Sequence, residues 1–436
     1  MPEFLTLLPP DEARALLLSH LADPSTSLRA TPLADSAALD SFLALGRVLA
    51  SDVAAPHPLP EFPRSTVDGY AVRAADTFGA GESLPAYLTL VGEIPMGAPA
   101  ALTLDSAQCA LIHTGGMLPA GSDAVVMVEY TQQIGRGDLH GRPGEIEIMR
   151  AVAVGENVIS IGEDVRAGQV VLPHGTLLRE AEIGGLMALG LTEVRVARKP
   201  RVGLISSGDE VVEPNQLAGP GQVRDINSYT LAALVTRGGG EAVRYGIVKD
   251  DFSALQAMAR KALSECDAVV ITAGSSASTR DMTADVIRTL GEPGVLAHGI
   301  NTRPGKPTIL GAAEGKAVIG LPGNPVSALV NGFLFVLPVV EKLLGVLPRP
   351  RATVMARLTV NLASQAGRED WWPVKLLTNY RSPITNYQLP ITNYDADPIF
   401  GKSNLIFTLA AADGLLRIPP DATGLSAGET VEVVLI

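Results

Sequence analysis

The chain has 436 residues, enough for about three domains that each bury a core of their own. Hydrophobic residues make up 47% of it, which predicts an ordered globular protein, and its 44 glycines and 32 prolines predict many tight turns. The formal net charge of −12 argues against a nucleic-acid partner, because binding to a phosphate backbone needs a basic surface. An acidic protein can still bind an anionic substrate where a few Lys and Arg side chains converge.

Cysteine usage and hydropathy favour a cytoplasmic protein without a membrane partner. Cys109 and Cys266 match no zinc-ligand spacing and are expected to be small buried residues in a reducing compartment. The first ten residues have no basic segment, so no secretion signal is expected. The most apolar stretch, 332–347, is interrupted by a proline and two charged residues, which predicts a core helix rather than a membrane span.

The first half of the chain combines short helices with β-structure. Two helical patterns occur within residues 11–50, the second over 37–49, and four prolines between 56 and 63 exclude a helix there and mark a linker. Residues 70–150 contain short apolar runs separated by Gly and Pro, which predicts strands. Glycines recur every six or seven residues through 155–175, predicting short strands and turns, and a helix is expected over 180–189.

Strands and helices alternate between residues 200 and 346. This alternation is typical of βαβ units and predicts a mostly parallel sheet covered by helices. Asn227 or Ser228 is the expected N-cap of the first helix. The predicted strands cover 201–206, 242–248, 268–272 and 317–320, and the predicted helices cover 228–237, 252–264, 283–290 and a long segment from 326.

After Pro348 the pattern returns to β, and the last predicted strand is 429–436. This region also contains three copies of a seven-residue repeat, between residues 378 and 398. Seven residues are too few for a solenoid unit, so an expanded surface loop or insertion is the preferred interpretation.

Carboxylates follow several strands of the predicted sheet. Ligands of open parallel sheets bind at the carboxyl ends of the strands, and those ends carry Asp209-Glu210, Asp250-Asp251 and the Gly/Ser-rich loop that ends at Asp281. Acidic groups beside a phosphate-binding loop would repel the ligand unless a hard cation such as Mg²⁺ joined them. Taken singly, these carboxylates have a simpler explanation: Asp251 would cap the helix at 252, and Asp281 the helix at 283.

Two cations follow in a proline-rich turn at residues 302–307. Arg303 and Lys306 are suited to binding an oxyanion. The convergence of these loops on one sheet edge favours a functional site, but the loops by themselves support only Mg²⁺-dependent phosphate chemistry.

At these loops the sequence resembles the molybdopterin molybdenumtransferase family, which includes the corresponding domain of gephyrin. The run from Pro60 to Arg73 is similar to the family pattern P-x-F-x-x-S-x-M-D-G-Y-A-V, and the run from Ile112 to Val126 is similar to I-x-T-G-A-x-x-P-x-G-A-D-A-V-V. Further matches follow in the family's order at 155–164, 207–210, 304–307, 321–327 and 412–415. The resemblance extends from about residue 35 to the C-terminus, except for the repeat.

The resemblance implies a multidomain fold of α/β and β units around a central, mostly parallel α/β sandwich of the molybdopterin-binding type. The implied parts are an elongated helical and β linker domain (1–54 and 150–197), a β domain (55–149), the molybdopterin-binding α/β domain (198–347) and a C-terminal β-barrel domain (348–436) with the repeat inserted near 378–398. It also implies a homodimer whose active site is shared between subunits.

Site residues carry over by motif position. Asp68 and Thr114 would come from the second subunit, while Glu210, Asp250 and Asp281 would act from the α/β side. Mg²⁺ would be held among Asp209, Glu210, Asp250 and Asp281, and the substrate would contact Gly274, Ser275, Ser276, Arg303, Lys306, Pro322, Gly323, Asn324, Pro325 and Ser327. The implied reaction is insertion of molybdate into adenylylated molybdopterin with release of AMP, the last step of molybdenum cofactor biosynthesis.

The sequence departs from the family pattern at a few positions. Ala284 stands where the family usually has Lys, which would remove one anion contact unless Arg280 or Arg303 replaces it. Ala273 replaces the first glycine of the glycine loop, Ser278 replaces a later one, and Val67 replaces the Met before Asp68.

Three other functions are compatible with parts of the pattern. A molybdopterin adenylyltransferase would need only residues 200–346, whereas here the β domains are present as well. A non-catalytic pterin-binding scaffold would not need the carboxylates. A nucleotide hydrolase of the competence-damage type would act on pyridine nucleotides.

The resemblance makes Asp281 a testable catalytic group. Asp281→Ala should abolish AMP release from adenylylated molybdopterin while leaving the fold intact, because the phosphoanhydride would lose a carboxylate that helps to place the cation. AMP release and circular dichroism measure the two effects. Unchanged turnover would remove Asp281 from the site.

Overall fold

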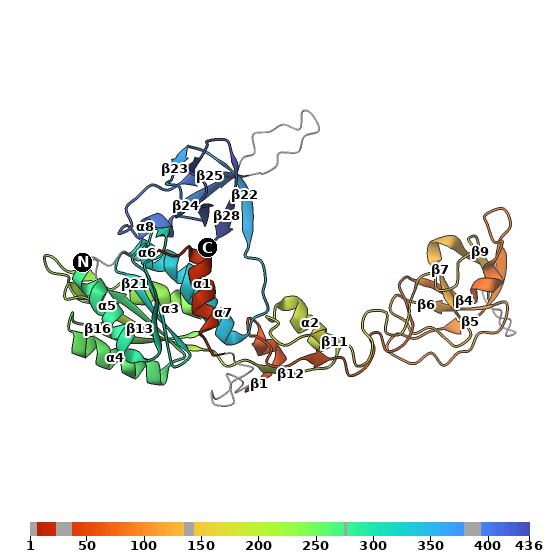
Figure 1. The fold of residues 1–436 in the computed structure, drawn as a ribbon. Helices are drawn as coiled ribbons and strands as arrows, with labels where there is room; N and C mark the ends of the chain where they lie inside the picture. Colours follow the sequence, from red (N-terminus) through yellow and green to blue (C-terminus); the bar gives the residue numbers. More distant parts are fainter. Residues whose placement is uncertain (1–6, 23–36, 135–143, 274–276, 379–393) are drawn as a thin grey trace.

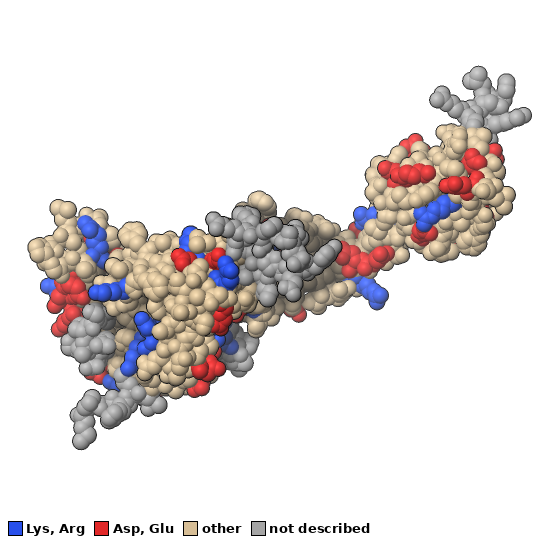
Figure 2. All heavy atoms as spheres, turned by 90° about the horizontal axis from the view of Figure 1, so that it is seen from above, with Lys and Arg blue, Asp and Glu red and all other residues tan. Residues whose placement is uncertain are grey.

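The computed structural model describes residues 7–22, 37–134, 144–273, 277–378 and 394–436, with backbone alone at 37–39, 273 and 277–281. The molecule is elongated, with a large lobe of α/β and barrel parts joined to a distant β lobe by a thin neck (Figure 1). The space-filling view shows the same two lobes, with acidic and basic side chains interspersed on the face drawn (Figure 2).

The neck consists of two chain segments that run in opposite directions and pair along their length. β1 (Ala37–Asp40) pairs with β12 (Glu193–Val196), β2 (Val53–Ala54) with β11 (Val170–Leu172), and β3 (Arg64–Ser65) with β10 (Val158–Ile159), all antiparallel. A small core of Leu49, Leu178, Leu186 and Val196 packs helix α2 (Glu180–Ala188) against the large-lobe end of this ladder. The chain therefore leaves the large lobe and returns to it along one path.

The helix expected over 37–49 is wrong. The segment begins as strand β1, and only Ser41–Ala44 form a short 3₁₀ turn, whose first residue follows Asp40. The Asp40 side chain accepts a hydrogen bond from Phe42 N at 2.9 Å. Pairing with β12 satisfies the backbone groups of residues 37–40, and that tertiary contact outweighs the local helical pattern.

The predicted glycine turns are confirmed in the returning segment. Gly155, Gly162, Gly168 and Gly175 all have φ between 68° and 82°, in the left-handed region that glycine adopts without steric cost. They connect the short strands β10 and β11, as the spacing predicts.

The distal lobe contains a six-stranded sheet of order β7-β4-β6-β5-β9-β8. Its core includes Cys109, where burial raises the pKa of the thiol to about 12. Its strands are β4 (Gly69–Val72), β5 (Ala86–Glu93), β6 (Gln108–Ile112), β7 (Ala124–Met127), β8 (Thr131–Ile134) and β9 (Glu145–Ile148).

The α/β part has a six-stranded sheet of order β16-β13-β17-β21-β20-β18. Every pairing is parallel except the two made by β20, so the prediction of a mostly parallel sheet is confirmed. Its strands are β13 (Arg201–Ser207), β16 (Glu241–Val248), β17 (Ala268–Ala273), β18 (Pro293–His298), β20 (Ile309–Ala313) and β21 (Lys316–Pro322).

Helices cover both faces of this sheet (Figure 1). Successive residues of one strand, such as Val269 and Val270, enter different cores. One core contains α4 (Phe252–Glu265) and α5 (Ala277–Leu290), and the other contains α1 (Pro10–Ser19), α3 (Asn227–Arg237) and the long helix made of α6 (Pro325–Asn331), a π-helical segment (Gly332–Val336) and α7 (Leu337–Leu344).

The long apolar helix is a core helix, as expected. Residues 325–344 are long and apolar enough to cross a membrane by length and composition, but 72% of the most hydrophobic window is buried inside the protein. Strands β17 and β21 and helix α3 supply much of its surroundings.

Five strands close into a barrel at the C-terminus. The order β24-β25-β22-β28-β26 is completed by pairing of β26 with β24, which confirms the expected barrel. The strands are β22 (Thr353–Leu358), β24 (Glu369–Thr378), β25 (Tyr394–Pro398), β26 (Gly414–Ile418) and β28 (Thr430–Leu435). The repeat lies outside the described residues except at its ends, where Thr378 pairs with Tyr394.

Gly69 gives a test of packing in the distal sheet. A Cβ atom there would lie 1.9 Å from the carbonyl oxygen of Val126 on the paired strand β7, whereas a Cβ on Gly81 would meet nothing within 4 Å. Gly69→Ala should lower the free energy of unfolding of this lobe by about 1–3 kcal/mol or more, because backbone must move. Calorimetric unfolding compared with Gly81→Ala measures it, and equal stability of the two variants would contradict the packing argument.

Candidate functional site

The carboxyl ends of β13 and β16 bring two predicted acidic loops together. Ser207, the last residue of β13, donates a hydrogen bond from Oγ to Asp250 Oδ1 at 2.9 Å, and Asp250 N lies 3.4 Å from Asp209 Oδ1. Parallel pairing of Ser207 with Val248 places these loops at one sheet edge. The structure thus joins Asp209 and Asp250, as the sequence predicts.

Glu210 lines a cavity of about 400 Å³ at the same edge. Ser206 and Ser207 form part of its wall, and Gly323, Asn324 and Pro325 close it from the loop after β21. We call it the carboxylate pocket, defined by Ser206, Ser207, Glu210, Val211, Val223, Arg224, Asp225, Ile226, Asn227, Thr272, Gly323, Asn324, Pro325 and Asn404.

A buried acid in this pocket was not predicted from the sequence. Asp225 is 4% exposed and accepts hydrogen bonds from Ser206 Oγ at 2.9 Å and from Ser228 Oγ at 2.5 Å. It also accepts from Ser228 N at 3.1 Å, so it satisfies a backbone N–H in the first turn of α3. The expected cap at Asn227 or Ser228 is wrong, because the helix already begins at Asn227. The signal available in the sequence was Asp three residues before Ser at a helix start.

Asn227 points its polar groups toward the pocket loops. Its Nδ2 donates to the carbonyl oxygen of Gly323 at 2.9 Å, which leaves Oδ1 without a protein partner although it is buried. Asn227 therefore ties the start of α3 to the loop after β21 and leaves one acceptor available.

Two predicted carboxylates have different structural roles. The Asp251 side chain accepts from Ala254 N at 2.8 Å and caps α4, which confirms the simpler interpretation. Asp281 lies inside α5, which begins at Ala277, so a cap of a helix beginning at 283 is wrong. The Asp281 side chain and residues Gly274, Ser275 and Ser276 lie outside what the structure describes.

The cation-bearing turn is held by a buried amide. Asn331, fully buried on α6, donates from Nδ2 to the carbonyl oxygens of Pro304 at 3.0 Å and Ser327 at 2.8 Å. Gly305 must lack a side chain, since a Cβ there would lie 1.7 Å from Asn331 Nδ2. These contacts hold the turn that carries Lys306, which lines the same cavity as Ser327.

Arg303 is engaged by the barrel rather than free. Its Nη1 lies 3.5 Å from Asp370 Oδ2, and its guanidinium lies 5.2 Å from the ring centroid of Trp372. Asp370 is fully buried and also accepts two hydrogen bonds from Arg368, at 2.7 and 3.1 Å. One carboxylate thus orients two guanidiniums. The contribution of the barrel residues Arg368, Asp370 and Trp372 was not predicted from the sequence.

These side chains line a second cavity, of about 740 Å³, between the α/β part and the barrel. We call it the cation pocket. Arg303, Lys306, Arg368 and Lys402 contribute positive charge, and Ser327 and Ser403 contribute hydroxyls. Its remaining lining residues are Thr302, Pro304, Gly305, Pro307, Pro322, Asn324, Val326, Trp371, Trp372, Pro373, Ile399, Gly401, Asn404 and Thr408.

The two pockets adjoin. Asn324 and Asn404 line both of them, and Asn324 Nδ2 donates to Ser403 Oγ at 3.1 Å. An anion with a large polar body can therefore place one end among cations and the other among carboxylates.

The donor chemistry at this edge suits Mg²⁺. Hard carboxylate oxygens are available at Asp209, Glu210 and Asp250, but the described residues contain no cluster of three His, Cys, Asp or Glu that could hold a metal ion. Mg²⁺ commonly takes one or two carboxylates together with substrate phosphates, so the fit depends on a phosphate-bearing substrate.

Asp68 and Thr114 meet in the distal lobe. Asp68 Oδ1 accepts hydrogen bonds from Thr114 N at 2.7 Å and from Thr114 Oγ1 at 3.1 Å, and His113 Nδ1 lies 3.8 Å away. These two hydrogen bonds, aided by His113, lower the pKa of Asp68. The ionised Asp68 therefore stabilises the folded lobe at pH values above the ordinary carboxyl pKa. This stabilisation is lost as the pH falls through the lowered pKa of Asp68. His113, held to Glu93 at 3.0 Å, was not predicted.

Asp68 directly precedes β4, and the neck separates the lobe that contains β4 from the α/β and barrel strands (Figure 1), whose residues line the two pockets. The described residues predicted for one site therefore lie in two groups, one in each lobe of the molecule.

Comparison with known proteins agrees with this architecture in every part. Residues 8–190 match the family model described as the MoeA N-terminal region (domain I and II), 203–342 match a probable molybdopterin binding domain, and 355–436 match the MoeA C-terminal region (domain IV). A putative molybdopterin biosynthesis protein of Methanocaldococcus jannaschii is 35% identical, over 91% of this chain and 92% of its own length. The chain belongs to the MoeA family.

Two further relatives have the same extent. Molybdopterin molybdenumtransferase 2 of Mycobacterium tuberculosis is 34% identical, over 89% of this chain and 92% of its own. A solved structure of the molybdopterin biosynthesis moeA protein of Pyrococcus horikoshii is 32% identical, with a TM-score of 0.80 and coverage of 99% of this chain and 100% of the other. The family resemblance seen in the sequence is confirmed.

Ala284, the departure from the MoeA-family pattern, is a core residue here. It is fully buried with Ile287 and Leu290 of α5 in the core beneath α4. This position therefore packs the helix and does not face either pocket's described lining.

Asn331 gives a test of how the cation turn is held. Asn331→Ala would remove a donor from the carbonyl oxygens of buried Ser327 and half-buried Pro304, and should lower the free energy of unfolding by about 1–3 kcal/mol. Urea unfolding measures the effect. Asn361→Ala, at an exposed asparagine of the barrel whose side chain caps Ala427 N, is the control and should cost less. Equal losses would show that the buried amide does not hold the turn.

Proposed function

We propose that this protein inserts molybdate into adenylylated molybdopterin and releases AMP, the last step of molybdenum cofactor biosynthesis. Relatives that cover most of the chain are named molybdopterin molybdenumtransferase, in Mycobacterium tuberculosis and in Staphylococcus epidermidis. The observation that carries the proposal is the junction of a cation pocket with a carboxylate pocket, joined at Asn324.

The cation pocket suits a tetrahedral oxyanion. Lys306 and Lys402 have no described carboxylate partner, while the hydroxyls of Ser327 and Ser403 can donate to oxyanion oxygens. Asp370 locks Arg303 and Arg368 in place and offsets part of their charge. We assign molybdate to this pocket, with Lys306 and Ser327 as its contacts from the α/β part.

The carboxylate pocket suits the pyrophosphate end of the substrate. Glu210 and Ser207 line this cavity, and Ser207 orients Asp250 beside it. Glu210 and Asp250, with Asp209 and Asp281, would hold Mg²⁺ there. When bound, the ion supplies neutralisation of the charge that develops as the phosphoanhydride breaks. Gly323 and Pro325 shape the wall, and Pro322 belongs to the cation pocket.

A homodimer would complete the site. Asp68 and Thr114 are exposed on the distal lobe, and the neck keeps them from the pockets of their own chain. We propose that a second copy brings this pair to the pockets, so that each active site contains residues of both subunits. Closed two-fold symmetry would then give two such sites per dimer.

We also propose that the enzyme works in the cytoplasm. Cys109 and Cys266 are free and buried, as expected for a reducing compartment.

The function is tested by supplying adenylylated molybdopterin and Mg²⁺ and measuring AMP release with and without molybdate. AMP release should depend on molybdate and fall by about 100-fold or more in Glu210→Gln, because the variant loses a charge that faces the reacting group. Glu213→Gln, which changes an acid outside the pocket, is the matched control. AMP release that ignores molybdate would argue against the insertion reaction.

Subunit sharing is tested by mixing two inactive variants. Asp68→Ala and Glu210→Gln should each be inactive alone, and subunit exchange between them should restore about one quarter of the wild-type activity, because half of the dimers then hold one intact site of two. A mixture of Asp68→Ala with Thr114→Ala should remain inactive. If mass measurement shows that subunits have exchanged and neither mixture recovers activity, a shared site would be contradicted.

A further inference from the structure

A third cavity lies toward the C-terminal end of the long helix, whereas the cation and carboxylate pockets lie at its N-terminal end. Its volume is about 770 Å³, and it is formed by α1, the end of α3, α7, the connection into the barrel and Leu435 of β28. No described residue of the cation or carboxylate pocket lines it. We call it the arginine pocket, defined by its charged lining residues Arg14, Arg237, Glu341, Lys342, Arg349 and Arg351.

The charge of this pocket is opposite to that of the chain. The protein has 46 acidic and 34 basic residues, yet five of the six charged residues in the pocket are cationic. Arg237 and Lys342 occupy the last turns of α3 and α7, where a positive charge is favourable by itself. Arg14, Arg349 and Arg351 do not lie in the last turn of a helix, so this effect does not account for them.

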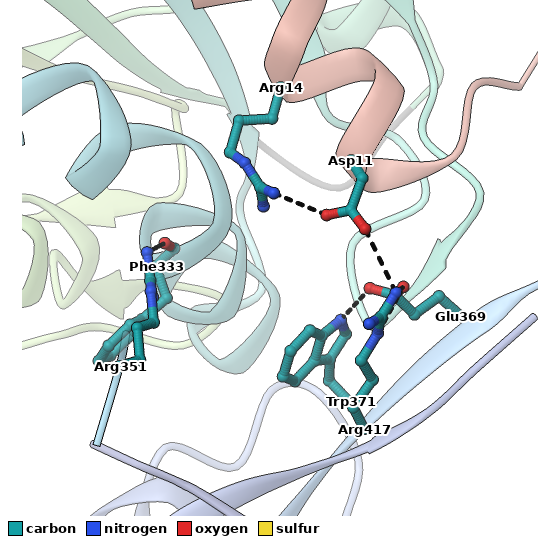
Figure 3. Close-up of polar contacts among 7 residues, drawn as sticks. All are labelled: Asp11, Arg14, Phe333, Arg351, Glu369, Trp371 and Arg417. Atoms are coloured by element: carbon teal, nitrogen blue, oxygen red, sulfur yellow. Dashed lines mark hydrogen bonds and ion pairs between the residues drawn. The ribbon is translucent and has the colours of Figure 1, made fainter. Parts of the chain in front are cut away.

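Two of the guanidiniums, those of Arg351 and Arg237, contact a backbone carbonyl and an aromatic ring rather than an acid. Arg351 Nη2 donates to the carbonyl oxygen of Phe333 at 3.4 Å, and the Arg237 guanidinium lies 4.7 Å from the centroid of the Phe333 ring. Among the described residues no carboxylate forms an ion pair with Arg237, Lys342, Arg349 or Arg351. Figure 3 shows Arg351 directed at the Phe333 carbonyl.

The one nearby ion pair leaves the pocket positive. Arg14 Nη2 lies 2.7 Å from Asp11 Oδ1, but the other oxygen of Asp11 lies 3.4 Å from Arg417 of the barrel (Figure 3). Asp11 is thus shared by two arginines. Partial burial lowers the pKa of Arg351; Glu341 opposes the shift, whereas Arg14 and Arg237 add to it. The arginine pocket therefore contains more positive than negative charge.

The backbone of the connection presents two of these arginines together. Arg349 and Arg351 alternate with Pro348 and Pro350, and proline restricts each preceding residue to extended conformations. Residues two apart on an extended chain point the same way. Both side chains line the cavity.

We propose that the arginine pocket binds a small molecule with a di- or triphosphate group. Convergent guanidiniums bind phosphate oxygens in a bidentate manner, and three or more of them suit a multiply charged anion rather than a single carboxylate. The volume lies in the range of small-molecule sites, and Leu18, Phe333 and Leu337 offer apolar surface to an uncharged part of the ligand. The site is independent of the proposed reaction.

Titration calorimetry of the full chain with inorganic pyrophosphate, without metal, tests the proposal. Lys306→Gln is the starting protein, because it weakens anion binding in the cation pocket. Adding Arg237→Gln should lower the remaining pyrophosphate affinity by roughly tenfold or more, since a guanidinium–phosphate contact is lost. Lys342→Gln, at a second pocket residue, should act in the same direction, and Arg288→Gln on α5 should have no effect.

The outcomes separate clearly. The proposal would be overturned if Lys306→Gln bound no pyrophosphate. It would also be overturned if adding Arg237→Gln or Lys342→Gln to folded Lys306→Gln left the pyrophosphate affinity unchanged. Tighter binding of citrate than of pyrophosphate would overturn the phosphate assignment. Arg237 is exposed, so its variant should fold, and circular dichroism verifies this.

Discussion

The antiparallel pairing of the outgoing and returning chain segments is the constraint on which the rest of the molecule depends. β1, β2 and β3 leave the large lobe, and β12, β11 and β10 return beside them. Each pair is only two to four residues long, so the ladder depends on the small core around Leu178 and Leu186 and on glycine turns that let the returning segment bend. This neck sets the distance between the two lobes and keeps the distal sheet away from the α/β part of the same chain (Figure 1).

Charge in the large lobe is organised across the border between the α/β part and the barrel. Asp370, fully buried on β24, holds Arg303 from one side of the border and Arg368 from the other. Breaking such a buried arrangement by removing one partner is strongly destabilising, because an uncompensated charge would stay behind. The same border is crossed by Arg417, which pairs with Glu369 and Asp11 (Figure 3). The barrel is thus part of the cation pocket and not an appended domain.

The α/β core and its acidic edge could be predicted from the sequence because their signals are local. Strand–helix alternation over 200–346 shows in short windows, and parallel strands place their following loops at one edge, so the meeting of Asp209 and Asp250 follows from connectivity alone. The capping role of Asp251 was equally local. Residues 37–49 were misread because their helical pattern lost to pairing with β12, which begins more than 150 residues later.

By itself, the sequence determined four of the six strands of the α/β sheet, the loops that carry acids and cations, and the family to which the chain belongs, whereas strands β18 and β20 were not predicted. Only the tertiary structure decided which of those charges are free. Arg303 is shared with Asp370, Asp225 is buried by Ser206 and Ser228, and Asn331 fixes the turn before Lys306. The physical reason is that a charge's role depends on its partners and its access to water, and those partners lie far away along the chain. The same reason places five cations around one cavity of an acidic protein, an arrangement that no window of the sequence displays.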